Sequence, residues 1–318
     1  MKKIITLFFL LLLTGCQDQV FSKDLFYMNT YINIKIYHHD QELVNKTFSD
    51  IEQIYQEYDQ LCDRYKKHEN NLYYLNNELE KNQEIEIDKR LYDLLKVSKD
   101  YYLKTNKFFS IALGNVTDVW TNNKELPSYE ELKASGSTDL DDIMLKENYI
   151  FSKNSDVSLD LGGIAKGYVN NIIKEYLHDK GIKKYLITSG TSSILIGEHY
   201  QNEKYRVGLI NPLESEKIYK VLKLNTNSIS TSGTIDNYYE FSGEKYSHII
   251  NPFTLYPDNY SLSVTVIAPD PILTEVLSTT LVLLPIEEGK KLAEKYDVEV
   301  IWFTKDGIIE TEGIKNYE

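Results

Sequence analysis

The chain has 318 residues, of which 48 are Asp or Glu and 35 are Lys or Arg, so its formal net charge at pH 7 is −13. A balance this acidic argues against a nucleic-acid partner, because phosphates bind to basic surfaces. It also argues against adhesion to anionic lipid by charge alone.

The first fifteen residues, MKKIITLFFLLLLTG, combine two lysines with a short apolar run, which predicts a secretory signal over residues 1–15. The run is too short to cross a bilayer as a helix, which takes about 20 apolar residues. The letters LTGC, ending at Cys16, resemble the bacterial lipobox, in which the signal is cut before a cysteine that then carries lipid. We therefore expect a protein held at the extracytoplasmic face of the cell membrane by lipid on Cys16. Cys62 would be the remaining cysteine, so no disulfide would form within the chain.

The polar residues after Cys16 predict a tether over residues 16–25, followed by one domain over residues 26–318. Alternation of apolar and polar residues predicts a first strand at about residues 30–37. Apolar residues then recur at helical spacing over residues 48–61 and again over residues 91–102, where Asp88 provides an N-cap.

The second half of the chain predicts further strands and helices. The letters SDVSLDLGG, residues 155–163, predict a strand that runs into two glycines, and a helix over residues 164–177 follows, which Gly181 can end. Two helices at about residues 272–283 and 287–296 precede a hairpin that turns at Asp306-Gly307. Strands are also expected over residues 183–190, 205–210, 217–224, 238–250 (with a turn at Ser242-Gly243) and 261–268. The pattern predicts one large α+β domain with mixed or antiparallel sheets and packed helices.

The letters DLGGIAKGY, Asp160 to Tyr168, bring two glycines to the start of a predicted helix. Backbone without Cβ atoms lets a ligand approach, and the first helical N–H groups attract an anion, which indicates a phosphate site. Lys166 lies in the first turn, where it can reach a phosphate or ribose oxygen. Neither G-x-G-x-x-G nor G-K-[ST] is present, so the Rossmann and Walker patterns are excluded. Asp160 can cap the helix, hold a ligand hydroxyl or face a metal, and a plain turn also fits this stretch.

Two further stretches carry candidate groups. In PILTEVLSTTLVL, Glu275 and Thr279 lie four residues apart on one helix face with Ser278 beside them, and such oxygen ligands suit Mg²⁺. An ordinary polar helix face has the same spacing. In YSHIINPFTLYP, His248 stands where a strand meets a loop, either as a structural residue or as a group that moves a proton near neutral pH.

Taken together and in order, DLGGIAKGY, TSGT, HIINPFTLYP and TEVLST resemble hallmark motifs of the ApbE family, the FAD:protein FMN transferases, whose members are commonly exported lipoproteins. YMNTY, CDRYKKHENNLYYLNN and KFFSIALGNVTDVW resemble earlier segments of the same family. The resemblance extends from about Phe26 to Trp302 and implies a single domain of the T-fold-related ApbE type.

The resemblance implies that FAD is the substrate, that Mg²⁺ is needed to split its pyrophosphate, and that FMN passes to a Thr or Ser hydroxyl of an acceptor protein in a membrane electron-transfer system. His248 would be the catalytic base for that hydroxyl. The metal would be held by Gly163, through its carbonyl, and by Glu275, Ser278 and Thr279. FAD would be contacted by Met28, Tyr65, Phe108, Phe109, Ser110, Asp160, Lys166 and Ile249.

The chain departs from the family pattern at five positions of the implied site. Glu275 replaces an aspartate of the metal helix, Leu255 replaces a glycine, and three further aspartates are replaced by Ser110, Thr234 and Asn251. These changes leave open a second hypothesis, a flavin-binding lipoprotein that has lost transfer activity and acts as a carrier or scaffold. A third, an unrelated solute-binding lipoprotein, is disfavoured by the order of the motifs.

Overall fold

The computed structural model describes residues 18–79, 83–235 and 237–318. The expected signal over residues 1–15 and the expected lipidation site Cys16 lie outside these ranges. Within them, no helix combines the length and the apolar character that a membrane crossing requires.

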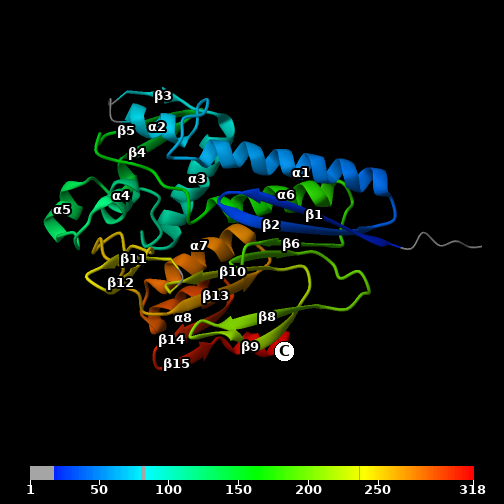
Figure 1. The fold of residues 1–318 in the computed structure, drawn as a ribbon. Helices are drawn as coiled ribbons and strands as arrows, with labels where there is room; N and C mark the ends of the chain where they lie inside the picture. Colours follow the sequence, from blue (N-terminus) through cyan, green and yellow to red (C-terminus); the bar gives the residue numbers. More distant parts are fainter. Residues whose placement is uncertain (1–17, 80–82, 236) are drawn as a thin grey trace, which may run out of the picture.

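An antiparallel sheet of eight strands forms the centre of the molecule, with the order β1-β2-β6-β7-β10-β13-β14-β15 (Figure 1). Its strands are β1 (Gln19–Tyr27), β2 (Thr30–His38), β6 (Tyr185–Ser189), β7 (Ser193–Ile196), β10 (Ser228–Gly233), β13 (Ser263–Ala268), β14 (Glu299–Thr304) and β15 (Gly307–Glu310). Neighbouring strands pair antiparallel throughout. The expected α+β fold with antiparallel sheets is confirmed.

The first strand of this sheet corrects one expectation. Most of the stretch expected as a tether forms β1, in which Gln19 pairs with His38 and Tyr27 pairs with Thr30. β1 is an edge strand with mostly exposed or half-exposed side chains. Such a strand accepts polar residues, so composition alone does not distinguish it from a linker.

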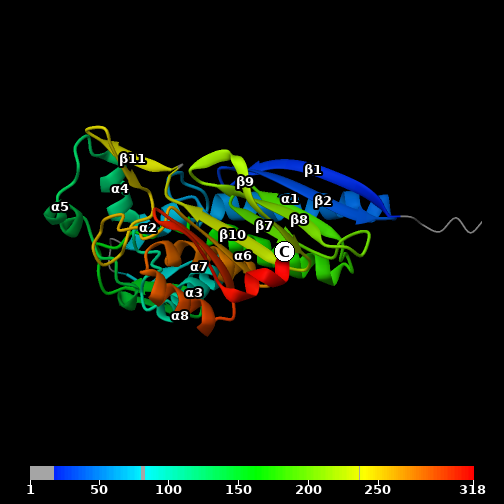
Figure 2. The ribbon, with the colours of Figure 1, turned by 90° about the horizontal axis from the view of Figure 1, so that it is seen from below.

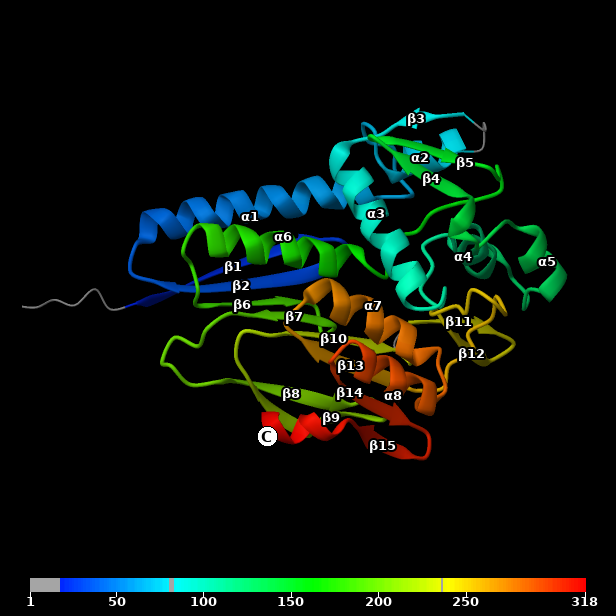
Figure 3. The same cartoon turned by 180° about the vertical axis from the view of Figure 1, so that it is seen from behind.

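Four helices cover one face of the sheet (Figures 1 and 3). They are α1 (Gln41–Cys62), α6 (Ala165–Asp179), α7 (Pro271–Val282) and α8 (Ile286–Lys295). α1 and α6 lie over β2 and its neighbours, where Ile32 and Ile34 are buried against the helices. α7 and α8 pack against β13 and β14, with Val266 and Trp302 at the centre of that cluster. The helices expected after Pro271 are confirmed.

The other face of the large sheet is covered by a hairpin of two strands, β8 (Tyr205–Asn211) and β9 (Glu214–Leu224), together with the 3₁₀ helix η2 (Glu312–Tyr317). Successive side chains of a strand point to opposite faces. Val266 of β13 therefore packs with α7 and α8, whereas Ile267 packs with the hairpin.

The remaining elements gather beyond one end of the large sheet (Figures 1 and 2). They are α2 (Leu72–Leu79), β3 (Ile85–Glu86), α3 (Lys89–Lys104), α4 (Gly114–Asn122), α5 (Tyr129–Ala134), η1 (Leu140–Asp142), β4 (Ile143–Lys146), β5 (Tyr149–Ser152), β11 (Tyr238–Phe241) and β12 (Glu244–Ser247). β3, β5 and β4 form a small sheet. The β11–β12 hairpin turns at Ser242 and Gly243, as expected, and packs its aromatic rings on Trp120 of α4.

Local signals for helix ends are confirmed, and one predicted strand is wrong. Asp88 caps α3 by accepting a hydrogen bond from the Arg90 N–H, and Gly181, just past α6, has φ +71°. Residues 155–161, however, pair with no strand. The N–H and C=O of Leu159 instead bond to the side-chain amide of Asn76, at 2.8 and 3.0 Å. The Asn76 side chain thus makes the backbone hydrogen bonds that a neighbouring strand would otherwise make.

Candidate functional site

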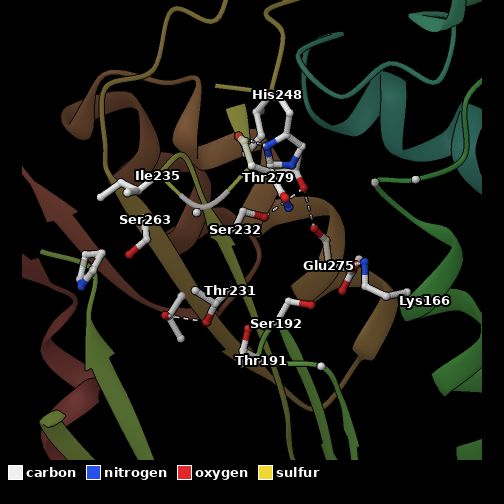
Figure 4. A pocket seen from close by; sticks show the side chains of 18 of the residues that line it. Lys166, Thr191, Ser192, Thr231, Ser232, Ile235, His248, Ser263, Glu275 and Thr279 are labelled. Atoms are coloured by element: carbon white, nitrogen blue, oxygen red, sulfur yellow. Dashed lines mark hydrogen bonds and ion pairs between the residues drawn. The ribbon is translucent and has the colours of Figure 1, made fainter. Parts of the chain in front are cut away.

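A cavity of about 990 Å³ opens where the ends of several strands meet α6 and α7. Its wall includes the β1–β2 turn, the β6–β7 turn, the end of β10 and the tip of the β8–β9 hairpin. Figure 4 shows side chains that line it from the β6–β7 turn, the end of β10, α6 and α7. The volume is within the range of pockets that hold a cofactor-sized ligand.

The glycine turn forms one wall of this cavity. One side-chain oxygen of Asp160 accepts a hydrogen bond of 2.8 Å from the Gly162 N–H, so this carboxylate stabilises the turn. A Cβ on Gly163 would lie 3.3 Å from the Phe109 ring, a tight contact that would press on this ring. α6 begins at Ala165 and places Lys166 in its first turn, as predicted.

Lys166 and Glu275 form an ion pair, with 2.7 Å between Nζ and Oε1. The carboxylate is buried, and its other oxygen, Oε2, accepts hydrogen bonds from the Ser193 and Ser230 hydroxyls at 2.7 and 3.1 Å. A buried carboxylate is stable as an anion only when it is paired in this way. The structure thus brings a predicted FAD contact and a predicted metal ligand into direct contact (Figure 4).

Thr279 lies one helical turn after Glu275 on the same face of α7, as predicted, and both residues line the cavity. Its hydroxyl is 3.2 Å from that of Ser232. Ser278 is buried and is not part of the cavity wall, and its hydroxyl lies 2.9 Å from the Ser232 hydroxyl. Its role as a metal ligand stays a prediction.

The oxygen donors around Glu275 fit a hard cation. Among the residues that the structure describes, no three His, Cys, Asp or Glu side chains cluster as metal ligands. Mg²⁺ needs no such cluster, because it commonly takes one or two carboxylates and completes its shell with water and substrate phosphate. Glu275, Thr279 and Gly163 all line the cavity, so their predicted roles in holding such a cation stay predictions.

His248 follows β12 and lines the same cavity. Its Nδ1 lies 2.9 Å from the Asn237 carbonyl oxygen. A carbonyl only accepts hydrogen bonds, so the neutral ring carries its hydrogen on Nδ1 and leaves Nε2 free to accept a proton. Desolvation lowers the pKa of the imidazole, and the charge of Lys166 lowers it further against the opposing hydrogen bond to Asn237.

Apolar and turn residues complete the wall. Phe108, Phe109 and Ile249 line the cavity, and the Phe108 ring meets the exposed Phe253 edge-on at 4.9 Å between centroids. Met28 lines it from the β1–β2 turn, with φ 52°.

Ser110 also lines the cavity, but its hydroxyl donates to the Thr138 carbonyl at 2.9 Å. This contact holds the residue in the loop before α4. The serine lacks the charge of the aspartate that the family motif has at this position.

Tyr65 differs from the other predicted FAD contacts, since it is 70% exposed and is not part of the cavity wall. It contacts Arg64, whose guanidinium carbon lies 5.0 Å from the Tyr65 ring centroid. Arg64 also forms a bidentate pair with Asp118, at 2.7 and 3.0 Å, and lies 3.5 Å from Asp160. Arg64 thereby joins Tyr65 and α4 to the glycine turn.

Three departures from the family pattern are accommodated by the backbone. Thr234 donates to the Leu262 carbonyl at 3.0 Å, and the Asn251 side chain accepts from the Phe253 N–H at 2.9 Å. Leu255 has φ +63°, a conformation that favours glycine, and its carbonyl accepts from the Trp120 indole at 3.0 Å. The leucine therefore adopts a left-handed backbone conformation at this position.

Sequence reasoning missed the hydroxyl groups that hold Glu275 and Thr279. Ser230 and Ser232 stand on β10 at strand period, and Ser193 stands on the neighbouring β7. The alternating serines of SISTSG were a signal of a polar strand face directed toward the site. Arg64 and Asp118 gave no comparable signal, because their pairing depends on segments 54 residues apart.

Comparison with known proteins agrees with this geometry. The model of the ApbE family matches residues 28–302. A FAD:protein FMN transferase of Klebsiella pneumoniae is 27% identical over 298 residues, which cover 91% of this chain and 90% of that protein. One of Buchnera aphidicola subsp. Baizongia pistaciae is 30% identical over 232 residues, covering 69% and 68%.

The fold has close counterparts among solved structures. The flavin transferase ApbE from Vibrio cholerae matches with a TM-score of 0.82 at 22% identity, covering 95% of this chain and 100% of that chain. The family model extends over most of the domain, from the β1–β2 turn to β14. The chain therefore belongs to the ApbE family.

Proposed function

We propose that the chain is a FAD:protein FMN transferase, which passes FMN from FAD to a Thr or Ser hydroxyl of an acceptor protein with the help of Mg²⁺. The observation that carries the proposal is the convergence of Lys166, Glu275, Thr279 and His248 on one cavity of about 990 Å³. Family membership supports it, because the curated relatives named above are FAD:protein FMN transferases.

The proposed reaction exchanges one phosphorus–oxygen bond for another. The acceptor hydroxyl oxygen bonds to the flavin-side phosphorus, while the bond from that phosphorus to the bridging oxygen breaks and AMP leaves with the electron pair. The hydroxyl proton passes to Nε2 of His248, which is free because Nδ1 is bonded to the Asn237 carbonyl. Lys166 and the N-terminus of α6 hold the negative phosphates in place.

The cation would be held by Glu275, Thr279 and the Gly163 carbonyl, with Ser278 as a further predicted ligand. When bound, Mg²⁺ neutralises charge on the phosphates of the substrate. Phe108, Phe109, Met28 and Ile249 offer apolar contacts for a flavin or adenine ring along the cavity wall.

The proposed place of action is the extracytoplasmic face of the cell membrane, with lipid on Cys16 as the anchor. The signal and the LTGC motif of the sequence support this location. The proposed acceptor is a protein of a membrane electron-transfer system that presents a Thr or Ser in an FMN-binding motif.

The replaced aspartates favour one competing function, a flavin carrier without turnover. The chain has Ser110, Thr234 and Asn251 where the family motifs have aspartates, and of these three Ser110 lines the cavity. The mature protein should therefore be incubated with FAD, Mg²⁺ and an acceptor domain, and the acceptor should be examined for covalent flavin fluorescence after denaturing electrophoresis.

We expect a labelled acceptor, and we expect His248→Asn to slow labelling by about 10²–10⁴-fold, as for loss of a general base, while FAD binding is kept. FAD binding without any label, on an acceptor that another family member does label, would establish the carrier function instead.

A further inference from the structure

The ion pair between Lys166 and Glu275 lies where the metal and the nucleotide are expected to meet. We propose that Lys166 and the divalent cation compete for Glu275, and that the nucleotide diphosphate draws Lys166 away from this carboxylate. Nucleotide and metal binding would then be linked, with the nucleotide preparing the metal site. The inference rests on the proposed function for the identity of the nucleotide.

The first step of the argument is that the Glu275 carboxylate has no oxygen left uncommitted. Oε1 contacts Lys166 at 2.7 Å, and Oε2 accepts from Ser193 and Ser230. Ser230 is in turn 3.0 Å from the Thr274 hydroxyl, and both serines are buried. The serine side is therefore fixed, and a cation entering from the cavity meets the oxygen that Lys166 already neutralises.

The second step is that Lys166 is the movable partner. Its side chain is 23% exposed, compared with 8% for that of Glu275. Lysine carries its charge on a flexible four-carbon stem, whereas Glu275 is held by two buried hydroxyls. Lys166 also stands in the first turn of α6, beside the glycine turn that suits a phosphate. Rotation about its own side-chain bonds would let the amino group exchange the carboxylate for a phosphate.

The third step is electrostatic. A dication bound at Glu275 while Lys166 stays there would bring like charges together in a partly buried site, where screening is weak. A diphosphate offers Lys166 another anion and leaves Glu275 free for the cation. The phosphates thereby favour metal binding beyond their own coordination of the ion, which is a coupling between two sites.

Mn²⁺ binding, measured by the electron paramagnetic resonance signal of the free ion, tests this competition without any acceptor protein. Without nucleotide, we expect Lys166→Met to bind Mn²⁺ about tenfold more tightly than the natural chain, within the usual range of such couplings. Lys166→Gln should behave alike, so the test does not depend on the folding of one variant. Lys46→Met, which removes the same charge from the exposed surface of α1, should leave Mn²⁺ binding unchanged.

ADP provides the second arm. At equal free ADP, Mn²⁺ binding should tighten more for the natural chain than for Lys166→Met, and this comparison cancels the binding of Mn²⁺ to ADP in solution. The proposal would be overturned if both Lys166 variants fold but bind Mn²⁺ no more tightly than the natural chain in the absence of nucleotide. It would also be overturned if Glu275→Gln bound Mn²⁺ as tightly as the natural chain. The coupling can hold in a protein that transfers no flavin, so failure of the transfer assay and failure of this test are distinguishable.

Discussion

His248 sets a pH limit on the proposed reaction. Only the neutral imidazole can take the proton from the hydroxyl of the acceptor protein. Desolvation, together with the charge of Lys166, holds the pKa of His248 below the ordinary value of 6.5. Activity should therefore rise with pH through this lowered pKa and stay level above it. We expect kcat/KM for acceptor labelling to be constant from about pH 7 to 8 and to fall toward pH 5. His248→Asn should lose the acid limb, and a rate that still climbs tenfold per pH unit above pH 7 would contradict this assignment.

Leu255 shows how a single residue is retained against its backbone preference. A left-handed conformation costs a non-glycine residue about 1–2 kcal/mol, whereas truncating a buried leucine costs about 2–5 kcal/mol. Both Leu255→Ala and Leu255→Gly should therefore destabilise the protein. Because glycine relieves φ +63° and alanine does not, we expect Leu255→Gly to be the more stable of the two by about 1 kcal/mol in urea unfolding.

The helical residue Leu281, buried in α7, provides the matched control. There the alanine variant should be more stable than the glycine variant by about 1 kcal/mol, because helix propensity favours alanine. The same order at both positions would mean that backbone conformation does not govern the response at Leu255.

At the scale of elements, the sequence predicted what local signals encode. The apolar period and the caps at Asp88 and Gly181 located long helices, because each signal lies within the segment that it organises. The β1 strand was missed, and a strand was wrongly predicted over residues 155–161, for the opposite reason. The partners of β1 lie in β2, and those of Leu159 lie on Asn76, so neither segment shows its hydrogen bonds in its own composition.

The candidate site likewise has a part that the sequence predicted and a part that depends on how the segments pack. Lys166, Glu275, Thr279 and His248 were predicted from motifs, and the structure brings all four to one cavity. The ion pair that joins Lys166 to Glu275, like the serines beneath it, arises only when α6, α7 and β10 pack together. Pairwise contacts between distant segments are a property of the fold and not of any one motif.

Asn76 carries a prediction about the segment that leads into the glycine turn. Its amide makes two hydrogen bonds to the backbone of Leu159, which is buried, so Asn76→Ala would leave both backbone groups without that partner. We expect a loss of about 2–3 kcal/mol in the free energy of unfolding and weaker FAD binding, because the turn next to it loses its support.

Urea unfolding and titration with FAD fluorescence measure the two effects. The neighbouring Asn77 is exposed, and its side chain donates one turn back, to the Tyr73 carbonyl of its own helix. Asn77→Ala should therefore cost less than about 0.5 kcal/mol and leave FAD binding unchanged. Weakening of FAD binding by both variants alike would count against a specific role for Asn76.

For the whole molecule, the β1 strand changes what a lipid anchor at Cys16 would do. Only two residues separate Cys16 from the start of β1 at Gln19, so the anchor would hold that end of the strand close to the bilayer. The other end of β1 leads into the turn of Met28, at the cavity. Nine residues of strand span roughly 30 Å, so a strand standing off the membrane would place the cavity about that far from the lipid.

Two exposed positions on the β1–β2 hairpin test this geometry. Val20 lies near the anchored end, and Tyr31 lies near the cavity. Each can be changed to cysteine and labelled with a fluorophore. The partly buried thiol of Cys62 competes little for the label, because desolvation raises its pKa to about 12 and it reacts poorly at neutral pH. On vesicles that carry spin-labelled headgroups, we expect the lipidated protein to show strong quenching at Val20→Cys and little at Tyr31→Cys. Equal quenching at both would mean that the hairpin lies along the membrane, and an acceptor hydroxyl would then be reached at the bilayer surface and not above it.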